Sequence, residues 1–236
     1  TFSEYAGKID ILQINGDLVD AQAISRFNKV YRKSPMEEIL IARQYMIDLI
    51  EMLQPKKVVV NYGNHDLRFQ NYLAKNLDTD LLELMPKTSL ELIFVDGFNH
   101  YNKELHTKVH YDPLIDVFKD SGIEIVYNDT WFSFVGETIF AHPLAYSSGM
   151  LKTAEKAYRY FKDNDYFFDT IVMAHTHKTG HYDIGNSVIY EQGCCYETSK
   201  MDYADGKLTP SQREGFILVY QDKFGRLNED KTHIVR

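Results

Sequence analysis

The sequence predicts a layered α/β or α+β protein, in which two β-rich halves suggest a two-sheet β-sandwich flanked by helices. In the first half, apolar strand-like runs alternate with segments of helical periodicity, whereas short strands with turn residues dominate the second half. The 236 residues, of which 44% are hydrophobic, are enough for a substantial core. We expect a single domain over residues 1–236, with residues 86–111 as a cap or insertion.

The first half predicts a strand–helix–strand unit with two parallel strands. Residues 9–15 are almost wholly apolar, as in a strand buried on both faces, and residues 57–62 form a second, valine-rich strand. Between them, Ser34-Pro35 marks the start of a helix that should stop before Pro55. The other helices predicted in this half lie at residues 21–32, at 67–85 with a break near Asp78, and at 112–121.

The second half predicts short strands joined by tight turns. Gly185-Asn186 lies between two alternating segments and favours a β-hairpin. One helix is predicted at residues 151–162. The predicted strands lie at residues 123–127, 131–135, 138–141, 170–174, 181–184, 187–191 and 216–221, with a final strand beyond Gly225.

Composition limits the classes of function. The formal net charge of -8 argues against a broad, sequence-independent grip on nucleic acid, although a nuclease with a local basic groove stays open. The only cysteines, Cys194 and Cys195, are adjacent and cannot form a disulfide framework, which favours a reducing compartment and a cytoplasmic protein. No apolar run reaches the roughly 18 residues of a membrane span, so we expect no membrane partner.

Four short motifs place oxygen and nitrogen donors where predicted strands end. A strand end is rigid and the loop after it is open to solvent, which suits divalent metals that need oxygen and imidazole ligands. The motifs are Gly16-Asp17-Leu18-Val19-Asp20, Gly63-Asn64-His65-Asp66, Ala141-His142-Pro143 and Ala174-His175-Thr176-His177.

These motifs, in this order, resemble those of the calcineurin-like metallophosphoesterases. That family carries D-x-H, G-D-x-x-D, G-N-H-[DE], a lone His and G-H-x-H; the resemblance spans residues 9 to about 195 and departs at Ala174, where the family has Gly. The resemblance implies an α/β/β/α sandwich with two divalent ions at one edge. We expect Mn²⁺, or a pair that includes Fe or Zn, because ligands of this mixed type do not fix the metal.

The resemblance also implies which residues bind the metals. Asp17 would bridge the two ions, and Asn64, His142 and His175 would complete one site. His177 would bind the other ion through the same loop as His175. Taken alone, Asp17 and Asn64 are ordinary turn residues and a single His at a strand end is more often structural, so the assignment depends on the whole set of motifs.

The catalytic roles implied by the resemblance centre on His65. This residue would contact the phosphoryl group and protonate the leaving oxygen, while Asp20 orients it. Asp20 also fits an acid favoured by a helix N-terminus, and both readings can hold together. Asp66 is expected to shape the loop, with assistance to His65 as the alternative role. Arg68 either binds a substrate phosphate or is a solvated helix residue.

The family's first motif, D-x-H, occurs nowhere in the sequence. The chain begins at Thr1, and its first predicted strand already leads into Gly16-Asp17, so we expect that a natural N-terminal segment carries the motif. The alternative is a non-catalytic scaffold of the same fold with an incomplete metal site.

The most favoured function is a phosphodiesterase or nuclease that hydrolyses nucleotides or short nucleic acid with a two-metal-activated water. The Ser/Thr phosphatases of the family extend the second motif with Arg-Gly, whereas Asp20 is followed here by Ala21-Gln22. His100, His106 and His110 would line a substrate cap, although loop histidines without a function are the simpler reading. Beyond a phosphoester substrate, the sequence predicts no partner, and it leaves the oligomeric state open.

Overall fold

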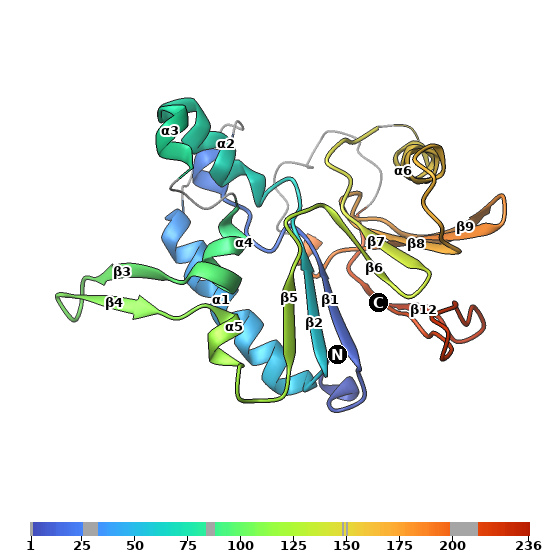
Figure 1. Cartoon of the computed structure of the whole chain (residues 1–236), viewed down its shortest axis with the longest axis horizontal. Helices are drawn as coiled ribbons and strands as arrows, with labels where there is room; N and C mark the ends of the chain where they lie inside the picture. The colour runs from blue at the N-terminus through green and yellow to red at the C-terminus, as the bar shows by residue number, and fades with distance from the viewer. Residues whose placement is uncertain (1, 26–32, 84–87, 148, 150, 199–211) are drawn as a thin grey trace. The chain divides into compact units, whose positions relative to one another are not determined.

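The computed structural model describes residues 2–25, 33–83, 88–147, 149, 151–198 and 212–236 (Figure 1). The chain divides into two compact units, unit 1 from Thr1 to Asp129 and unit 2 from Thr130 to Arg236. Each contains a β-sheet with helices, so the predicted α/β class with two β-rich halves is confirmed. The packing of the two sheets as a sandwich, and a single domain over 1–236, stay predictions.

Unit 1 is built on a three-stranded parallel sheet in the order β1-β2-β5 (Figure 1). The strands are β1 (Ile11–Asn15), β2 (Lys57–Asn61) and β5 (Glu124–Tyr127). Long helix α1 (Pro35–Leu53) buries Ile39, Met46 and Ile50 in the same core cluster as the β2 side chains. The predicted strand–helix–strand unit with parallel strands is therefore confirmed.

The ends of α1 follow from the residues that flank it. Ser34 takes an extended N-cap conformation and Pro35 occupies the first turn, although the Ser34 side chain makes no capping hydrogen bond. The helix ends at Leu53, and its C-cap residue Gln54 is left-handed with φ of 48°, directly before Pro55. A residue before proline is disfavoured in the helical region, so this stop was visible in the sequence.

The prediction that the strand is buried on both faces is correct for β2 and wrong for β1. The β2 residues from Val58 onward are buried, whereas Ile11 in β1 is 37% exposed. Among the described residues, β1 lies at the edge of its sheet. The side chains of an edge strand are covered less completely than those of the central strand, and apolar sequence alone does not distinguish the two positions.

Most of the remaining elements of unit 1 lie between β2 and β5 in the sequence. The two helices predicted on either side of Asp78 are present, and the Asp78 side chain caps the second by accepting from the Asp80 N–H at 3.3 Å. These elements are α2 (Leu67–Asn76), α3 (Thr79–Leu82), α4 (Ser89–Glu91), the π-helix η3 (Leu92–Asp96), the hairpin of β3 (Phe98–Asn102) and β4 (Thr107–Tyr111), and α5 (Leu114–Val117). Two 3-10 helices, η1 (Phe2–Tyr5) and η2 (Gln22–Ile24), flank β1 in sequence.

Two predicted helices of unit 1 need correction. The helix expected at residues 112–121 is reduced to α5, because the Ser121 N–H and hydroxyl both donate to the Phe118 carbonyl and close a turn. Of the helix expected at residues 21–32, the 3-10 helix η2 is present, and residues 26–32 lie outside the described part of the chain.

Unit 2 contains a five-stranded sheet in the order β6-β7-β8-β10-β9. Its strands are β6 (Phe132–Val135), β7 (Thr138–Ala141), β8 (Thr170–Met173), β9 (Thr179–Ile184) and β10 (Ser187–Gln192). The strands β7, β8 and β10 are mutually parallel, and β9 and β10 form the hairpin predicted at Gly185-Asn186.

Different layers cover the two faces of this sheet. Helix α6 (Lys152–Asp163) packs on one face, where Ala154, Ala157 and Phe161 join a buried cluster with Ile171 and Ile189. The other face carries a smaller cluster that includes residues of β11 (Phe216–Leu218) and β12 (His233–Val235), an antiparallel pair. Among the helices of the described residues, none is both long and apolar enough to cross a membrane.

Candidate functional site

The loops that follow β1 and β2 lie in direct backbone contact. Asn15 and Asn61, the last residues of the two strands, are register partners. Beyond them, Gly16 has φ of +78°, and a Cβ at this position would lie 2.4 Å from the Gly63 nitrogen. Only glycine fits such an approach with positive φ. The first two motifs are therefore brought together by parallel pairing and two glycines.

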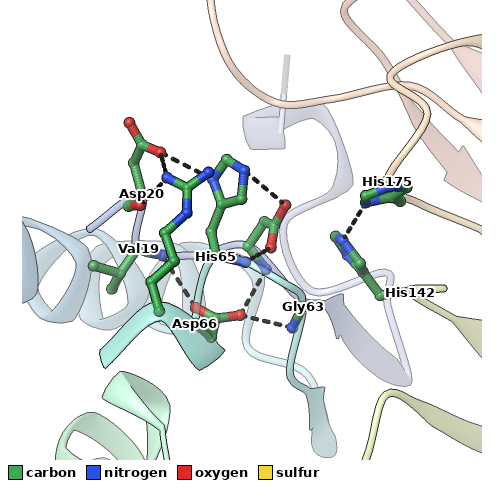
Figure 2. A network of polar contacts seen from close by, with 9 residues as sticks. Val19, Asp20, Gly63, His65, Asp66, His142 and His175 are labelled. Atoms are coloured by element: carbon green, nitrogen blue, oxygen red, sulfur yellow. Dashed lines mark hydrogen bonds and ion pairs between the residues drawn. The ribbon is translucent and has the colours of Figure 1, made fainter. Parts of the chain in front are cut away.

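Asp66 ties these loops to each other. Its side chain is fully buried, and one carboxylate oxygen accepts from the backbone N–H groups of Asp17 at 2.7 Å and Gly63 at 2.8 Å (Figure 2). The other oxygen accepts a longer bond, 3.4 Å, from the Val19 N–H. Asp66 thus holds Asp17 in a left-handed conformation with φ of 56°. These bonds support the loop-shaping role expected for Asp66.

His65 is held between two carboxylates. Its Nδ1 lies 2.9 Å from Asp20 Oδ1, and its backbone N–H donates to Asp17 Oδ1 at 2.8 Å (Figure 2). The other ring nitrogen, Nε2, lies 3.9 Å from Asp17 Oδ2. The contact through Nδ1 fixes the ring orientation, so Nε2 is the nitrogen presented toward the Asp17 carboxylate.

Arg68 holds Asp20 in turn. Its Nη1 donates to the Asp20 carboxylate at 2.8 Å and to the Asp20 carbonyl at 2.7 Å, and its side chain is only 17% exposed. Arg68 is therefore an ion-pair partner rather than a solvated helix residue. A contact between Arg68 and substrate stays a prediction. Asn64 lies half-buried in the same loop, directly before His65.

The surroundings of Asp20 and Glu38 shift the pKa values of these two carboxyl groups in opposite directions. Burial raises the pKa of Asp20, but the hydrogen bond and charge of His65, together with Arg68, outweigh it and hold this pKa below its ordinary value. Burial raises the pKa of Glu38 in the first turn of α1, and the charge of Asp20 raises it further. The His65–Asp20–Arg68 chain thus keeps Asp20 ionised to a more acidic pH than an ordinary aspartate.

An asparagine ladder that the sequence analysis missed crosses the same end of the sheet. The Asn61 amide donates to Asn15 Oδ1 at 3.3 Å, and the Asn128 amide donates to Asn61 Oδ1 at 3.1 Å. These residues end β1 and β2 or follow β5, and Asn15 and Asn61 are buried. The signal in the sequence was an Asn at the end of each apolar run. The ladder cross-links the three strand ends below the loops.

In unit 2, two histidines meet at the ends of parallel strands. His142 directly follows β7 and is 1% exposed, and its backbone N–H donates to the Trp131 carbonyl at 2.7 Å. His175 follows β8 after one residue, and the Ala174 N–H continues the pairing to Ala141 at 3.0 Å. His142 Nε2 lies 3.2 Å from His175 Nδ1 (Figure 2).

The loop that carries His175 and His177 has a strained backbone. Both histidines have positive φ, 75° and 55°. The Thr176 N–H donates to the Ala174 carbonyl at 3.0 Å, so a γ-turn is centred on His175. Strain of this kind costs free energy and concentrates at functional sites. The His177 carbonyl accepts from the Arg213 N–H at 2.8 Å, which anchors the end of the loop.

The histidine pair fits the geometry of two ligands on one metal ion. Two nitrogens bound at about 2.0–2.1 Å and subtending 90–110° at the ion lie about 2.9–3.4 Å apart. The observed 3.2 Å between the His142 and His175 nitrogens falls in that range. The same distance also allows a hydrogen bond between neutral rings, which would hold the pair in place without a metal.

The remaining histidines singled out by the sequence lie on the β3–β4 hairpin of unit 1. His100 is in β3, His106 is in the connecting turn and His110 is in β4. His110 is engaged locally, with Asn99 Oδ1 at 3.0 Å and Asp112 Oδ1 at 3.3 Å. The expected cap at residues 86–111 thus contains this hairpin, and its role as a cap stays a prediction.

These observations define an α/β protein with Asp, Asn and His side chains presented on loops at the ends of parallel strands. The family model of the calcineurin-like phosphoesterases matches residues 2–179, which is more than half of the chain. The chain therefore belongs to the calcineurin-like phosphoesterase family.

Two further comparisons give weaker results than the family model. Among solved structures, the chain is similar to the crystal structure of a single mutant of Vps29 from Entamoeba histolytica, with 13% sequence identity and a TM-score of 0.36. That match covers 95% of this chain and 97% of the other. A comparison with curated proteins found no match.

Proposed function

We propose that this protein is a metal-dependent phosphoester hydrolase, and specifically a phosphodiesterase or nuclease that acts on nucleotides or short nucleic acid. Family membership supports the hydrolase class. The observation that carries the proposal is the clamp on His65, whose Nδ1 is held at 2.9 Å by Asp20 while Nε2 is presented toward Asp17. A buried loop network maintains this arrangement.

The proposed metal ligands are the donors identified in each unit. They are Asp17 and Asn64 in unit 1, and His142, His175 and His177 in unit 2, for two divalent ions that we expect to be Mn²⁺ or a pair that includes Fe or Zn. The 3.2 Å separation of the His142 and His175 nitrogens supports metal binding within unit 2. Bound there, divalent ions would neutralise the phosphate charge and lower the pKa of the attacking water.

The protein's own contribution to bond cleavage centres on His65. As an imidazolium, His65 donates its Nε2 proton to the leaving oxygen of the ester and so acts as a general acid. Asp20 accepts the Nδ1–H, which fixes the orientation of the ring. Arg68 keeps Asp20 in position and ionised. The net charge of -8 favours small substrates over long nucleic acid bound along its backbone.

The test is hydrolysis of bis-p-nitrophenyl phosphate and p-nitrophenyl phosphate by the natural full-length protein with Mn²⁺. We expect the diester to be cleaved, and Asp17→Asn to abolish turnover. His65→Ala should lower kcat by about 10²–10⁴, the range of general acid catalysis. The matched control is His233→Ala, since His233 is exposed and its ring lies beside the Lys231 carbonyl and the Tyr220 ring, neither of which belongs to the proposed site.

Each result distinguishes the proposed phosphodiesterase from an alternative function. Wild-type rates from Asp17→Asn or His65→Ala would show that these residues are not the catalytic site. Cleavage of the monoester alone would replace the phosphodiesterase with a phosphatase. The alternative, a non-catalytic scaffold, predicts that neither ester is hydrolysed by the wild-type protein.

A further inference from the structure

The histidine loop of unit 2 passes over the end of a neighbouring strand. In the sheet, β10 lies between β8 and β9. Glu191 near the end of β10 is the register partner of Met173 in β8 and of Gly180 in β9. The segment that joins β8 to β9, residues 174–178, carries His175 and His177. It must therefore cross above the C-terminal end of β10, where Glu191 lies.

Glu191 points to the face of the sheet that α6 covers. Side chains alternate along a strand, so Glu191 shares a face with Ile189, which belongs to the α6-covered cluster together with Met173. The Glu191 side chain is only 4% exposed. Its neighbour across the pair, Gly180, has no side chain, which leaves room beside the carboxylate. Burial raises the pKa of Tyr182, and the Glu191 charge adds to it, as expected on a shared face.

A buried carboxylate at the position of Glu191 needs a partner that compensates its negative charge. Burying a charge without a partner is costly, and within the described part of the chain Glu191 Oε1 has no hydrogen-bond donor. Two further hydroxyls, that of Tyr182 on the adjacent strand and that of Thr176 in the histidine loop, are also buried and lack a partner among the described residues. None of the steps assigned to catalysis uses Glu191.

We propose that Glu191 is a positioning residue of the histidine loop, whose buried negative charge favours divalent cations at His175 and at His177. The inference rests on the metal site of the proposed function. Outer-shell carboxylates near metal-binding histidines raise metal affinity, typically about 10–100-fold, and Glu191 would act here through its charge. Salt screens a buried charge much less than an exposed one, so the effect persists at physiological ionic strength.

The experiment compares Mn²⁺ affinity and metal-free stability in the full-length protein. Glu191→Gln keeps the shape and removes the charge, and Glu229→Gln removes an exposed charge in the same unit as a control. We expect Glu191→Gln to weaken Mn²⁺ binding at least about tenfold by titration calorimetry. Its metal-free Tm should equal or exceed that of the wild type, because a neutral amide is easier to bury. Glu229→Gln should change neither quantity.

A purely structural role gives the opposite pattern. Mn²⁺ affinity within about twofold of wild type in Glu191→Gln would overturn the proposal, whatever the Tm. Glu191→Met provides a second variant that fills similar volume, and it should weaken Mn²⁺ binding in the same way. If both variants unfold without metal, the carboxylate serves packing and the proposal is wrong.

The readout also separates this inference from the proposed function. Mn²⁺ binding is measured without hydrolysis. If Glu191→Gln weakens Mn²⁺ binding as expected but the wild-type protein cleaves no ester, the proposed function alone is refuted. A wild-type protein that binds no Mn²⁺ would refute the role of Glu191.

Discussion

Replacement of Asp66 by Ala gives the sharpest test of how the first two motifs are held together. In the native structure, the buried carboxylate accepts N–H groups from Asp17 and Gly63 at 2.7 and 2.8 Å, and a third from Val19 at 3.4 Å. Alanine leaves these donors without an acceptor. The Gly63 backbone is buried, so water cannot easily replace the lost oxygen there.

The expected loss follows from the two short bonds. A hydrogen bond to a charged group contributes about 1.5–3 kcal/mol, and a buried donor left without a partner costs a similar amount. Asp17 is only half-buried and water can reach it, so we take the lower end for each bond. Asp66→Ala should therefore reduce the free energy of unfolding by about 3 kcal/mol. This is a large part of the roughly 5–15 kcal/mol of an ordinary domain.

The assay is urea unfolding followed by far-UV circular dichroism, with hydrogen exchange of the Asp17 and Gly63 amides as a local readout. Both amides should lose protection in Asp66→Ala. Asp66→Asn keeps an oxygen that can accept both short bonds and loses only the charge, so it should cost less than Asp66→Ala. Asp120→Ala, at an exposed acid of the same unit, should stay within about 0.5 kcal/mol of wild type. A loss below about 1 kcal/mol in Asp66→Ala, or unchanged amide protection, would refute the reasoning.

Three further predictions test neighbouring features. Gly16→Ala should lower the free energy of unfolding by about 2–4 kcal/mol in urea, because its Cβ meets the facing loop and its φ is positive. Gly7→Ala, which has open space at φ of +67°, should lower it by about 1 kcal/mol. Equal losses in the two variants would contradict this reasoning. The pKa of Asp20 is lowered, so its contribution to stability is present above the unfolded value of 3.8 and is lost as pH falls through the lower folded pKa. Asp20→Asn should therefore lose less stability than wild type between neutral pH and about pH 3, and an equal loss in both would count against the ion pair. In calorimetry, His175→Ala should weaken Mn²⁺ binding while His65→Ala spares it; the reverse order would exclude the assigned roles.

Part of this protein could be predicted from local sequence signals. The bounds of α1 followed from Pro35 and Pro55, since proline acts on its immediate neighbours. The turn at Gly185-Asn186 and the valine-rich β2 were equally local. The four motifs, each following an apolar run, identified the family that the comparison then matched.

Signals that depend on the environment were misread. Apolar composition suggested full burial of β1, but its edge position leaves Ile11 exposed. The helix predicted at residues 112–121 failed because the Ser121 side chain competes for a backbone carbonyl. The outcome for β1 depended on sheet neighbours that the local pattern does not specify, whereas the Ser121 bond is local and the prediction overlooked it.

The sequence by itself determined which side chains are available at the strand ends, because motif residues and strand periodicity are properties of short segments. Only the tertiary structure decided how they are used. Asp66 binds Asp17 across 49 residues, and His142 meets His175 across 33. Glu191 lies under a histidine loop because β10 inserts between β8 and β9. Such contacts arise from the pairing of distant strands, which fixes distances and burial that no local pattern encodes.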